Sequence, residues 1–402
     1  MKKWTYGIIT ASLLIIAACS GQPDYSEKAN ELAQSFIIVD THVDVPYRLK
    51  NSWADISERT EGGDFDYVRA QEGGLDAPFM SIYIPAEYQE TGGAKAVADS
   101  LIDMVNGIAR ENPDKFAIAT SPEQISEQHE KNLISLPMGI ENGAPIGQDL
   151  ENIAYFFDRG IRYITLTHSK DNQISDSSYD TTYTHNGLSK FGEEVVQEMN
   201  RIGMMVDISH VSDSAFYDVI NITKAPVIAS HSSARHFTPG FERNMSDEMI
   251  ESLAENGGVI MINFGSTFLD EESRASSADI REHISSWLEE NETERSDSTA
   301  QAYIENYRAE NFKYSTVSKV ADHIDHVVNL VGIEHVGLGS DYDGVGDTLP
   351  AGLKDVSDFP NLIEELLERG YSESEIQKIC SGNIFRVWNE VNRISGEINA
   401  ES

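Results

Sequence analysis

Apolar runs that end in polar residues recur along this chain, and they constrain its fold more than any other feature. The run at residues 36–39 leads to His42 and Asp44. Runs of this kind are typical of strands that are buried on both faces of a parallel sheet. Later runs lead to the following side chains: Glu141, His168, His210, His231, Asp341 and Asp343. Because each of these residues can bind a metal ion or a substrate, the recurrence predicts that several strands end at one site.

The runs alternate with longer amphipathic segments, which indicates a parallel α/β architecture. We expect strands near residues 35–41, 78–84, 133–140, 161–166, 203–208, 226–230, 257–264 and 334–339. We expect helices at 93–110, 192–202, 247–256, 317–331 and 361–368. Eight strands with intervening helices favour a closed (β/α)8 TIM-type barrel over an open sheet. In such barrels the active site lies where the strands end.

Residues 266–312 exceed the spacing of a compact barrel. This segment is polar and acidic, and Ile284, Trp287 and Leu288 give part of it a helical apolar face. We therefore expect an acidic helical insertion after the seventh strand, on the catalytic face. The sequence is compatible with two roles for this segment, a lid over the site and a solvent-exposed excursion of the chain.

The net charge of -37 argues strongly against nucleic-acid binding, which depends on basic patches, so we expect no nucleic-acid partner. The same charge would repel acidic substrates unless a local cation captures them.

The N-terminus has the pattern of a bacterial lipoprotein leader. Lys2 and Lys3 precede a short apolar stretch, and residues 16–19 read Ile-Ala-Ala-Cys, similar to a lipobox. We expect a signal peptide at 1–18, lipidation of Cys19, a polar tether at 19–30 and the barrel domain at 31–402. An ordinary secretory signal is the alternative. Lipidation of Cys19 would mean that the protein is exported and lipid-anchored to a bacterial membrane on its periplasmic side. Ser20 favours the outer membrane.

Three histidines, an aspartate and a glutamate suit two Zn²⁺ ions that share a bridging carboxylate. The motifs around them resemble those of the membrane (renal) dipeptidases, the M19 zinc peptidases of the amidohydrolase-like barrels. The resemblance extends from about residue 37 to residue 391. It rests on segments 40–44, 139–143, 207–210, 229–235, 243–244 and 337–344, with 352–356 after them.

The resemblance implies a ligand set and a substrate class. His42, Asp44 and Glu141 would bind one zinc ion, and Glu141, His210 and His231 the other. The expected reaction is attack of a metal-bridged hydroxide on the peptide bond of a dipeptide, including dipeptides with a C-terminal D-residue.

The resemblance also implies three substrate-facing residues. Asp341 would carry the proton to the leaving amine, and His168 would stabilise the oxyanion. Arg243 would bind the substrate carboxylate, with Arg235 as the alternative.

Other functions remain open at this stage. A related binuclear amidohydrolase would act on another amide, a lactone or a β-lactam. However, many such enzymes bridge their metals with a carboxylated lysine, and Glu141 fills that position here. A solute-binding lipoprotein without catalysis is a second alternative. The sequence leaves the oligomeric state open, a homodimer included.

Overall fold

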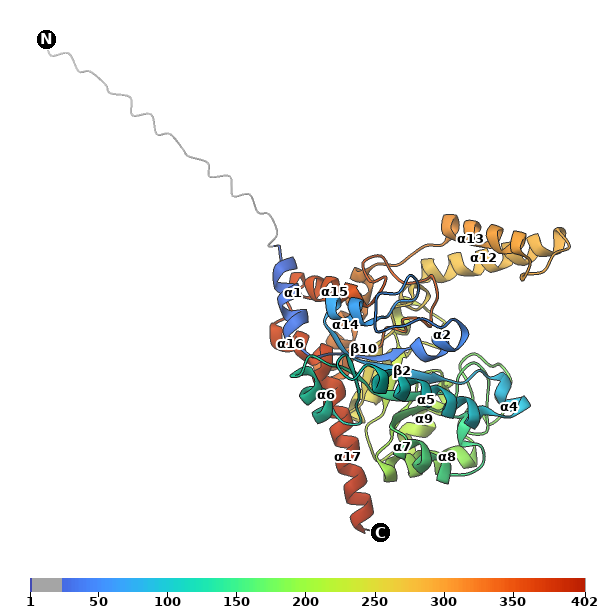
Figure 1. Ribbon diagram of the computed structural model, residues 1–402, viewed down its shortest axis with the longest axis vertical. Helices are drawn as coiled ribbons and strands as arrows, with labels where there is room; N and C mark the ends of the chain where they lie inside the picture. Colours follow the sequence, from blue (N-terminus) through green and yellow to red (C-terminus); the bar gives the residue numbers. More distant parts are fainter. Residues whose placement is uncertain (2–23, 402) are drawn as a thin grey trace.

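The computed structural model describes residue 1 and residues 24–401 (Figure 1). Eight parallel strands form one sheet in the order β1-β2-β5-β6-β7-β8-β9-β10. Their bounds are β1 Ile38–Val43, β2 Leu75–Tyr83, β5 Met138–Glu141, β6 Ile161–Thr165, β7 Met205–Asp207, β8 Ile228–Ser232, β9 Val259–Ile262 and β10 Val336–Leu338. The first and last strands meet just beyond their ends, where the Asp44 N–H donates to the Tyr342 carbonyl at 2.9 Å. The predicted (β/α)8 TIM-type barrel is confirmed.

One predicted strand is wrong in detail, because the run at 133–140 forms two strands. Residues Ile134–Leu136 (β4) pair with Phe116–Ile118 (β3) in a separate two-stranded sheet, and β5 begins only at Met138. Pro137 lies between them and has no N–H to donate to a strand ladder. Its carbonyl accepts from the Met80 N–H at 2.8 Å, so the chain enters the barrel at this residue.

Helices surround the barrel and continue beyond it. Those that follow or flank the barrel strands are α2 Val45–Asn51, α3 Tyr67–Gly73, α5 Ala94–Glu111, α7 Glu151–Asp158, α8 Lys190–Ile202, α9 Asp213–Ile222, α10 Asp247–Glu255, α14 Val317–Val331 and α15 Phe359–Glu368. The others are α1 Ser26–Ser35, α4 Glu87–Thr91, α6 Pro122–His129, α11 Ser266–Leu269, α12 Glu271–Glu290, α13 Ser298–Asn311, α16 Glu373–Gln377 and α17 Asn383–Glu401. All five predicted helices are present. Residues 26–30, which we expected in the tether, instead begin α1, and Ala29 is buried there.

The interior of the barrel is a packed core. Inward-pointing side chains include Val39, Phe79, Tyr163 and Met261. Helix α17 closes the end at which the strands begin, and its Trp388 ring lies 5.4 Å from that of Phe79. Because this end is filled, only the opposite end, where the strands finish, is free to hold a site.

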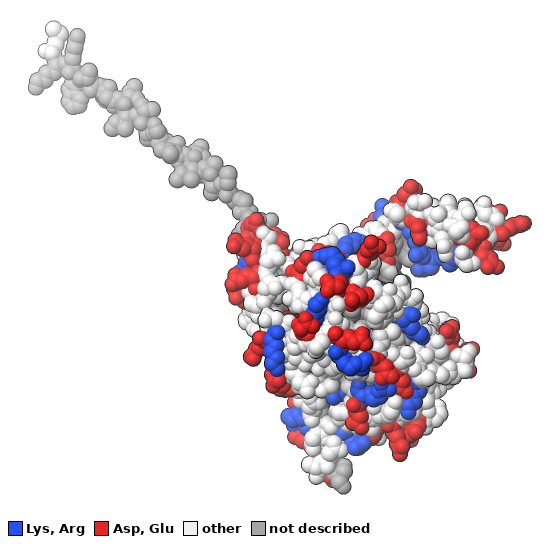
Figure 2. All heavy atoms as spheres, in the orientation of Figure 1, with Lys and Arg blue, Asp and Glu red and all other residues white. Residues whose placement is uncertain are grey.

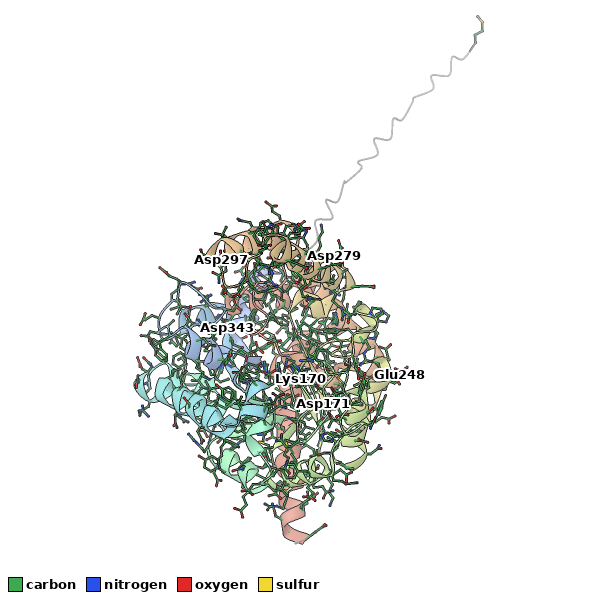
Figure 3. The ribbon with its side chains drawn as sticks, turned by 90° about the vertical axis from the view of Figure 1, so that its right-hand side faces the viewer. Lys170, Asp171, Glu248, Asp279, Asp297 and Asp343 are labelled. Carbon is green, nitrogen blue, oxygen red and sulfur yellow. The ribbon has the colours of Figure 1, made fainter. Side chains whose placement is uncertain are left out.

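The predicted insertion is helical. Helices α12 and α13 form an arm that projects from the barrel in Figure 1 and carries Asp279 and Asp297 at the top of Figure 3. A small apolar cluster of Ile280, Ile284 and Ile304 holds the two helices together. In Figure 2, acidic side chains gather towards the tip of the arm and basic ones on the side that faces the barrel. Among the described residues, every helix is too short or too polar to cross a bilayer.

Candidate metal centre

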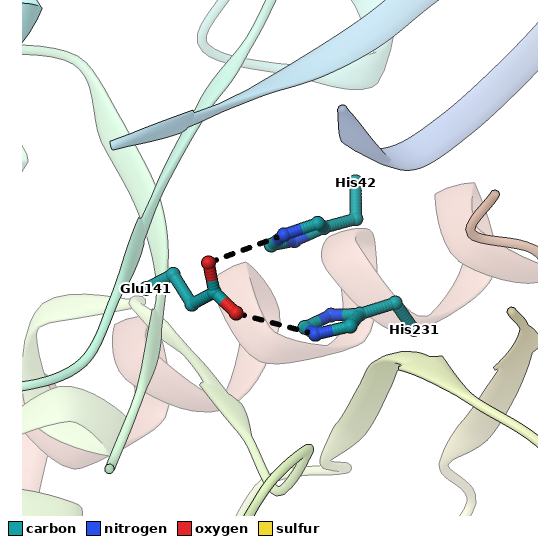
Figure 4. Close-up of side chains that lie close together, drawn as sticks. All are labelled: His42, Glu141 and His231. Carbon is teal, nitrogen blue, oxygen red and sulfur yellow. Dashed lines mark ion pairs between the residues drawn. The ribbon is translucent and has the colours of Figure 1, made fainter. Parts of the chain in front are cut away.

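Glu141, the last residue of β5, lies at the centre of a buried histidine cluster. Its Oε2 atom is 3.4 Å from the His42 Nε2 atom. Its Oε1 atom is 3.1 Å from the His210 Nε2 atom and 3.4 Å from the His231 Nε2 atom. Figure 4 shows the two oxygens facing His42 and His231 separately. The carboxylate therefore presents one oxygen to each of two groups of nitrogen atoms.

The ends of four other barrel strands, β1, β6, β7 and β8, supply the other members of the cluster. His42 lies in β1, and the Asp44 Oδ2 atom immediately after that strand is 3.5 Å from its Nε2 atom. His231 lies in β8, and His210 follows β7 with φ of 69°. His168 follows β6, and its Nε2 atom is 3.5 Å from the Glu141 Oε1 atom. The structure thus brings together all five residues predicted as ligands.

Hydrogen bonds fix the tautomer of His42. The Tyr163 hydroxyl donates to the Thr41 carbonyl at 3.0 Å and lies 2.9 Å from the His42 Nδ1 atom. Since that hydroxyl has one proton and gives it to Thr41, the His42 Nδ1 atom must be the donor to Tyr163. The lone pair of His42 is then on Nε2, which faces Glu141 and Asp44. This is the tautomer of a metal-binding imidazole.

The same reasoning applies to His231. The Ser230 hydroxyl donates to the Asp207 Oδ2 atom at 2.6 Å and lies 2.7 Å from the His231 Nδ1 atom. The His231 Nδ1–H therefore donates to Ser230, and its Nε2 lone pair faces Glu141. Asp207 is held in turn by the backbone N–H groups of Ser209 and Ser230.

These contacts leave electron-rich atoms facing one another without protons between them. The His42 Nε2 atom and the Asp44 Oδ1 atom are buried and have no hydrogen-bond partner among the described residues. Buried polar atoms are normally paired, and a carboxylate that faces imidazole lone pairs is repelled by them. Divalent cations between these atoms would remove both problems. Imidazole and carboxylate donors are those that zinc prefers, so the residues fit such ions.

Asp341 lies beside the cluster, just after β10, with φ of 65°. Its N–H donates to the His42 carbonyl at 3.1 Å, and its Oδ2 atom accepts from the Asn263 amide at 2.7 Å. Burial raises the pKa of the Asp341 carboxyl, and the neighbouring Asp44 and Glu141 charges raise it further. A left-handed φ is uncommon outside glycine, although aspartate adopts it more readily than most residues, and residues in this conformation concentrate at functional sites.

The structure places Arg243, not Arg235, beside the cluster. Arg243 is buried, and its terminal nitrogens donate to the Ser232 hydroxyl and to the His231 carbonyl, each at 2.7 Å. Its Nε atom is buried without a partner among the described residues. Arg235 instead donates to both carboxylate oxygens of Asp213.

A cavity of about 910 Å³ opens from the cluster. Its lining includes the predicted site residues Asp44, Glu141, His168, His210 and Asp341. Aromatic side chains form much of the remaining wall, and the first turns of α12 form another part. The prediction that the insertion lies on the catalytic face is therefore confirmed.

Two other residues from the sequence motifs have structural partners. The Asp343 carboxylate forms an ion pair with the Arg48 guanidinium, with Oδ2 2.9 Å from Nε, and it accepts from the Asp64 N–H at 2.7 Å. Asn142 has φ of 80°, a conformation that asparagine tolerates, and its amide donates to the Ile84 carbonyl. These residues shape the loops around the cluster.

Sequence reasoning missed the residues that hold the ligands in place. Asn263 directly follows β9, so its position after an apolar run was a usable signal. Asp207 also carried a signal, as the acidic end of β7. Tyr163 gave none, because a tyrosine inside a strand looks like an ordinary core residue.

Known proteins are similar to this chain in sequence and in fold. The membrane dipeptidase family, peptidase family M19, matches residues 26–402. Dipeptidase 3 of Mus musculus is 31% identical over 383 residues, covering 92% of this chain and 68% of that protein. Dipeptidase 3 of Rattus norvegicus has the same identity and coverage.

Solved structures agree with these matches. The probable dipeptidase PvdM from Pseudomonas aeruginosa has a TM-score of 0.80 at 25% identity and covers 92% of this chain and 98% of its own. A metallo peptidase from Rhodobacter sphaeroides, solved with a phosphinate mimic of the dipeptide L-Ala-D-Ala, has the same fold. Its TM-score is 0.73 at 24% identity, covering 89% of this chain and 99% of its own. With a family match along the whole barrel and a clustered set of metal-binding side chains, this chain belongs to the membrane dipeptidase family of metallopeptidases.

Proposed function

We propose that this dipeptidase holds two zinc ions, with His42, Asp44 and Glu141 at one and Glu141, His210 and His231 at the other. The main support is the Glu141 carboxylate, whose two oxygens face His42 on one side and His210 and His231 on the other. The fixed tautomers of His42 and His231 add to it, because both Nε2 lone pairs face that carboxylate. Bound zinc ions would supply a water molecule with a pKa lowered to about 7.

The surrounding residues would then bind and orient the dipeptide. Arg243 would pair with its terminal carboxylate through the N–H groups that Ser232 and His231 leave free, the buried Nε–H among them. Asp341 would take a proton from the attacking water and give it to the leaving amine. Burial lowers the pKa of His168, so at neutral pH its imidazole is neutral and would donate a hydrogen bond to the developing oxyanion.

The open cavity supports a broad substrate range. The cavity of about 910 Å³ exceeds the size of a dipeptide, and aromatic side chains form much of its wall. We therefore include dipeptides with a C-terminal D-residue among the proposed substrates.

A dipeptide panel tests this function. The purified protein is assayed on Ala-Ala with L- and D-residues at each position, after chelation and again after zinc is restored. We expect hydrolysis of L-Ala-L-Ala and L-Ala-D-Ala that is lost with the metal and returns with zinc. Hydrolysis that survives complete metal removal, or failure to cleave any dipeptide with zinc present, would contradict the proposal.

We also propose that the enzyme works outside the cytoplasm, attached to a membrane by lipid at Cys19. Residues 2–18 of the leader and Cys19 lie outside the described residues, so the support comes from the sequence alone. Helix α1, which begins at Ser26, packs against α15 and brings the chain to the barrel surface soon after that point (Figure 1).

A further inference from the structure

Two arginines flank an aromatic pair in the wall of the active-site cavity. The Phe241 and Phe268 rings lie edge to face with centroids 5.6 Å apart. The Arg243 guanidinium lies 5.4 Å from the Phe268 centroid, and the Arg274 guanidinium lies 3.7 Å from the Phe241 centroid. Stacking of this kind orients a guanidinium while leaving its N–H edge available. Arg274 is thus an oriented cation in the cavity lining, in addition to Arg243 beside the metal cluster.

Arg274 forms no ion pair among the residues that the structure describes, and Glu271 of the same cavity lining acts on it only from beyond ion-pair distance. No carboxylate lies within ion-pair distance of it, and its Nη1 atom is buried without a hydrogen-bond partner. This is notable in a chain with 67 acidic residues against 30 basic ones. Arg369, in contrast, contacts three carboxylates. An unpaired buried N–H is costly, which points to a ligand that supplies the missing acceptor.

The insertion places this cation at the cavity. Arg274 is in the first turn of α12, and it lines the same cavity as Glu141 and Asp341. Arg281, two turns further along α12, also lines it, and its own hydrogen bond is to the neutral Ser277 hydroxyl. Figure 2 shows basic side chains on the side of the arm that faces the barrel.

We propose that the site selects dipeptides whose C-terminal residue carries a side-chain carboxylate, aspartate or glutamate. This inference rests on the proposed dipeptidase function. Arg243 binds the α-carboxylate, and Arg274 binds the side-chain carboxylate across the Phe241–Phe268 pair. The overall charge of -37 does not prevent this, because exposed charges are screened beyond about 8 Å at physiological ionic strength. Binding of the substrate carboxylates therefore depends on the nearby guanidinium groups of Arg243 and Arg274.

The test compares Ala-Glu with Ala-Gln, which differ only in the charge of the second side chain. For the wild-type enzyme with zinc we expect kcat/KM to favour Ala-Glu by about 10-fold, the scale of one charge-assisted hydrogen bond. In Arg274→Gln this preference should fall below about 2-fold through a higher KM for Ala-Glu, with kcat/KM for Ala-Gln kept within about 2-fold. Arg308→Gln, on helix α13 and outside the cavity lining, is the matched control and should keep the preference.

The outcomes separate this inference from the proposed function. If the wild-type enzyme with zinc hydrolysed no dipeptide, the proposed function itself would be overturned. Hydrolysis of Ala-Gln and Ala-Glu at equal kcat/KM would overturn only the acidic preference. A preference that persists in Arg274→Gln, or one for Glu-Ala over Gln-Ala that exceeds that for Ala-Glu over Ala-Gln, would overturn the assignment to Arg274.

Discussion

At the scale of single residues, the metal centre depends on side chains that need not touch a metal. Tyr163 fixes the His42 tautomer because its hydroxyl donates to the Thr41 carbonyl and accepts from the His42 Nδ1–H. Tyr163→Phe should therefore lower zinc affinity about 10- to 100-fold, the usual effect of removing such a partner. Competition with a chelator of known affinity measures this.

Tyr342→Phe is the matched control for that variant. Tyr342 is also fully buried near the end of a barrel strand, but its hydroxyl has no hydrogen-bond partner among the described residues. It should keep wild-type zinc affinity. Equal affinity losses in both variants would mean that a buried hydroxyl matters only for packing.

We predict that Asp341 takes a proton from the attacking water and gives it to the leaving amine. Asp341→Asn should retain both metal ions and slow dipeptide hydrolysis by about 100-fold or more, because an amide cannot exchange the proton. In the wild type the Asn263 amide donates to the Asp341 carboxylate. In the variant it would face the amide of the new asparagine, which can rotate so that its oxygen accepts the same hydrogen bond. Metal analysis and kcat on the same sample decide the matter. Loss of metal with little further defect would make Asp341 chiefly a ligand.

At the scale of elements, His323 ties three segments of the barrel surface together. It lies in α14, where its Nδ1 atom accepts from the Ala234 N–H after β8 and its Nε2–H donates to the Leu269 carbonyl of α11. These contacts give His323 a structural role between the three segments. Burial lowers the pKa of His323 to about 4.

The lowered pKa predicts a pH-dependent stability. The unfolded chain takes up a proton at His323 near pH 6.5 and the folded chain does not, so stability is full above that pH and falls below it until about pH 4. His323→Gln cannot titrate. The difference in unfolding free energy between wild type and this variant should narrow by about 2 kcal/mol between pH 7.5 and pH 5. Urea titrations at the two pH values measure it, and a constant difference would argue against a buried neutral histidine.

The elements also explain how far sequence alone could reach. Apolar runs ending in His42, Glu141 and His231 revealed the strand ends, because parallel strands buried on both faces lack polar interruptions. The division at Pro137 escaped prediction, since both halves of the run are buried and apolar. The direction of the α12–α13 arm was also out of reach. It depends on tertiary contacts such as the Ser315 N–H to Ser266 Oγ hydrogen bond of 2.9 Å at its base.

At the scale of the whole molecule, the N-terminal leader at residues 1–18 predicts the cellular location of the enzyme. Cys19→Ala should remove the lipid attachment site and release the enzyme from the membrane fraction, while Ser20→Ala should leave it attached. Cell fractionation followed by dipeptidase assay of each fraction measures this. A Cys19→Ala variant that stays in the membrane fraction as fully as wild type would show that the leader acts in another way.

The central claim is that one carboxylate at the end of β5 joins two metal ions in a single hydrolytic site. Zinc content and turnover measured on the same preparations of wild type, Glu141→Gln and the exposed control Glu397→Gln test it most directly. We predict two zinc ions per chain and full activity in wild type and in Glu397→Gln. Glu141→Gln should lose zinc and turnover together, because a neutral amide does not bridge two dications. A Glu141→Gln enzyme with two bound zinc ions and a near-normal rate would contradict the account.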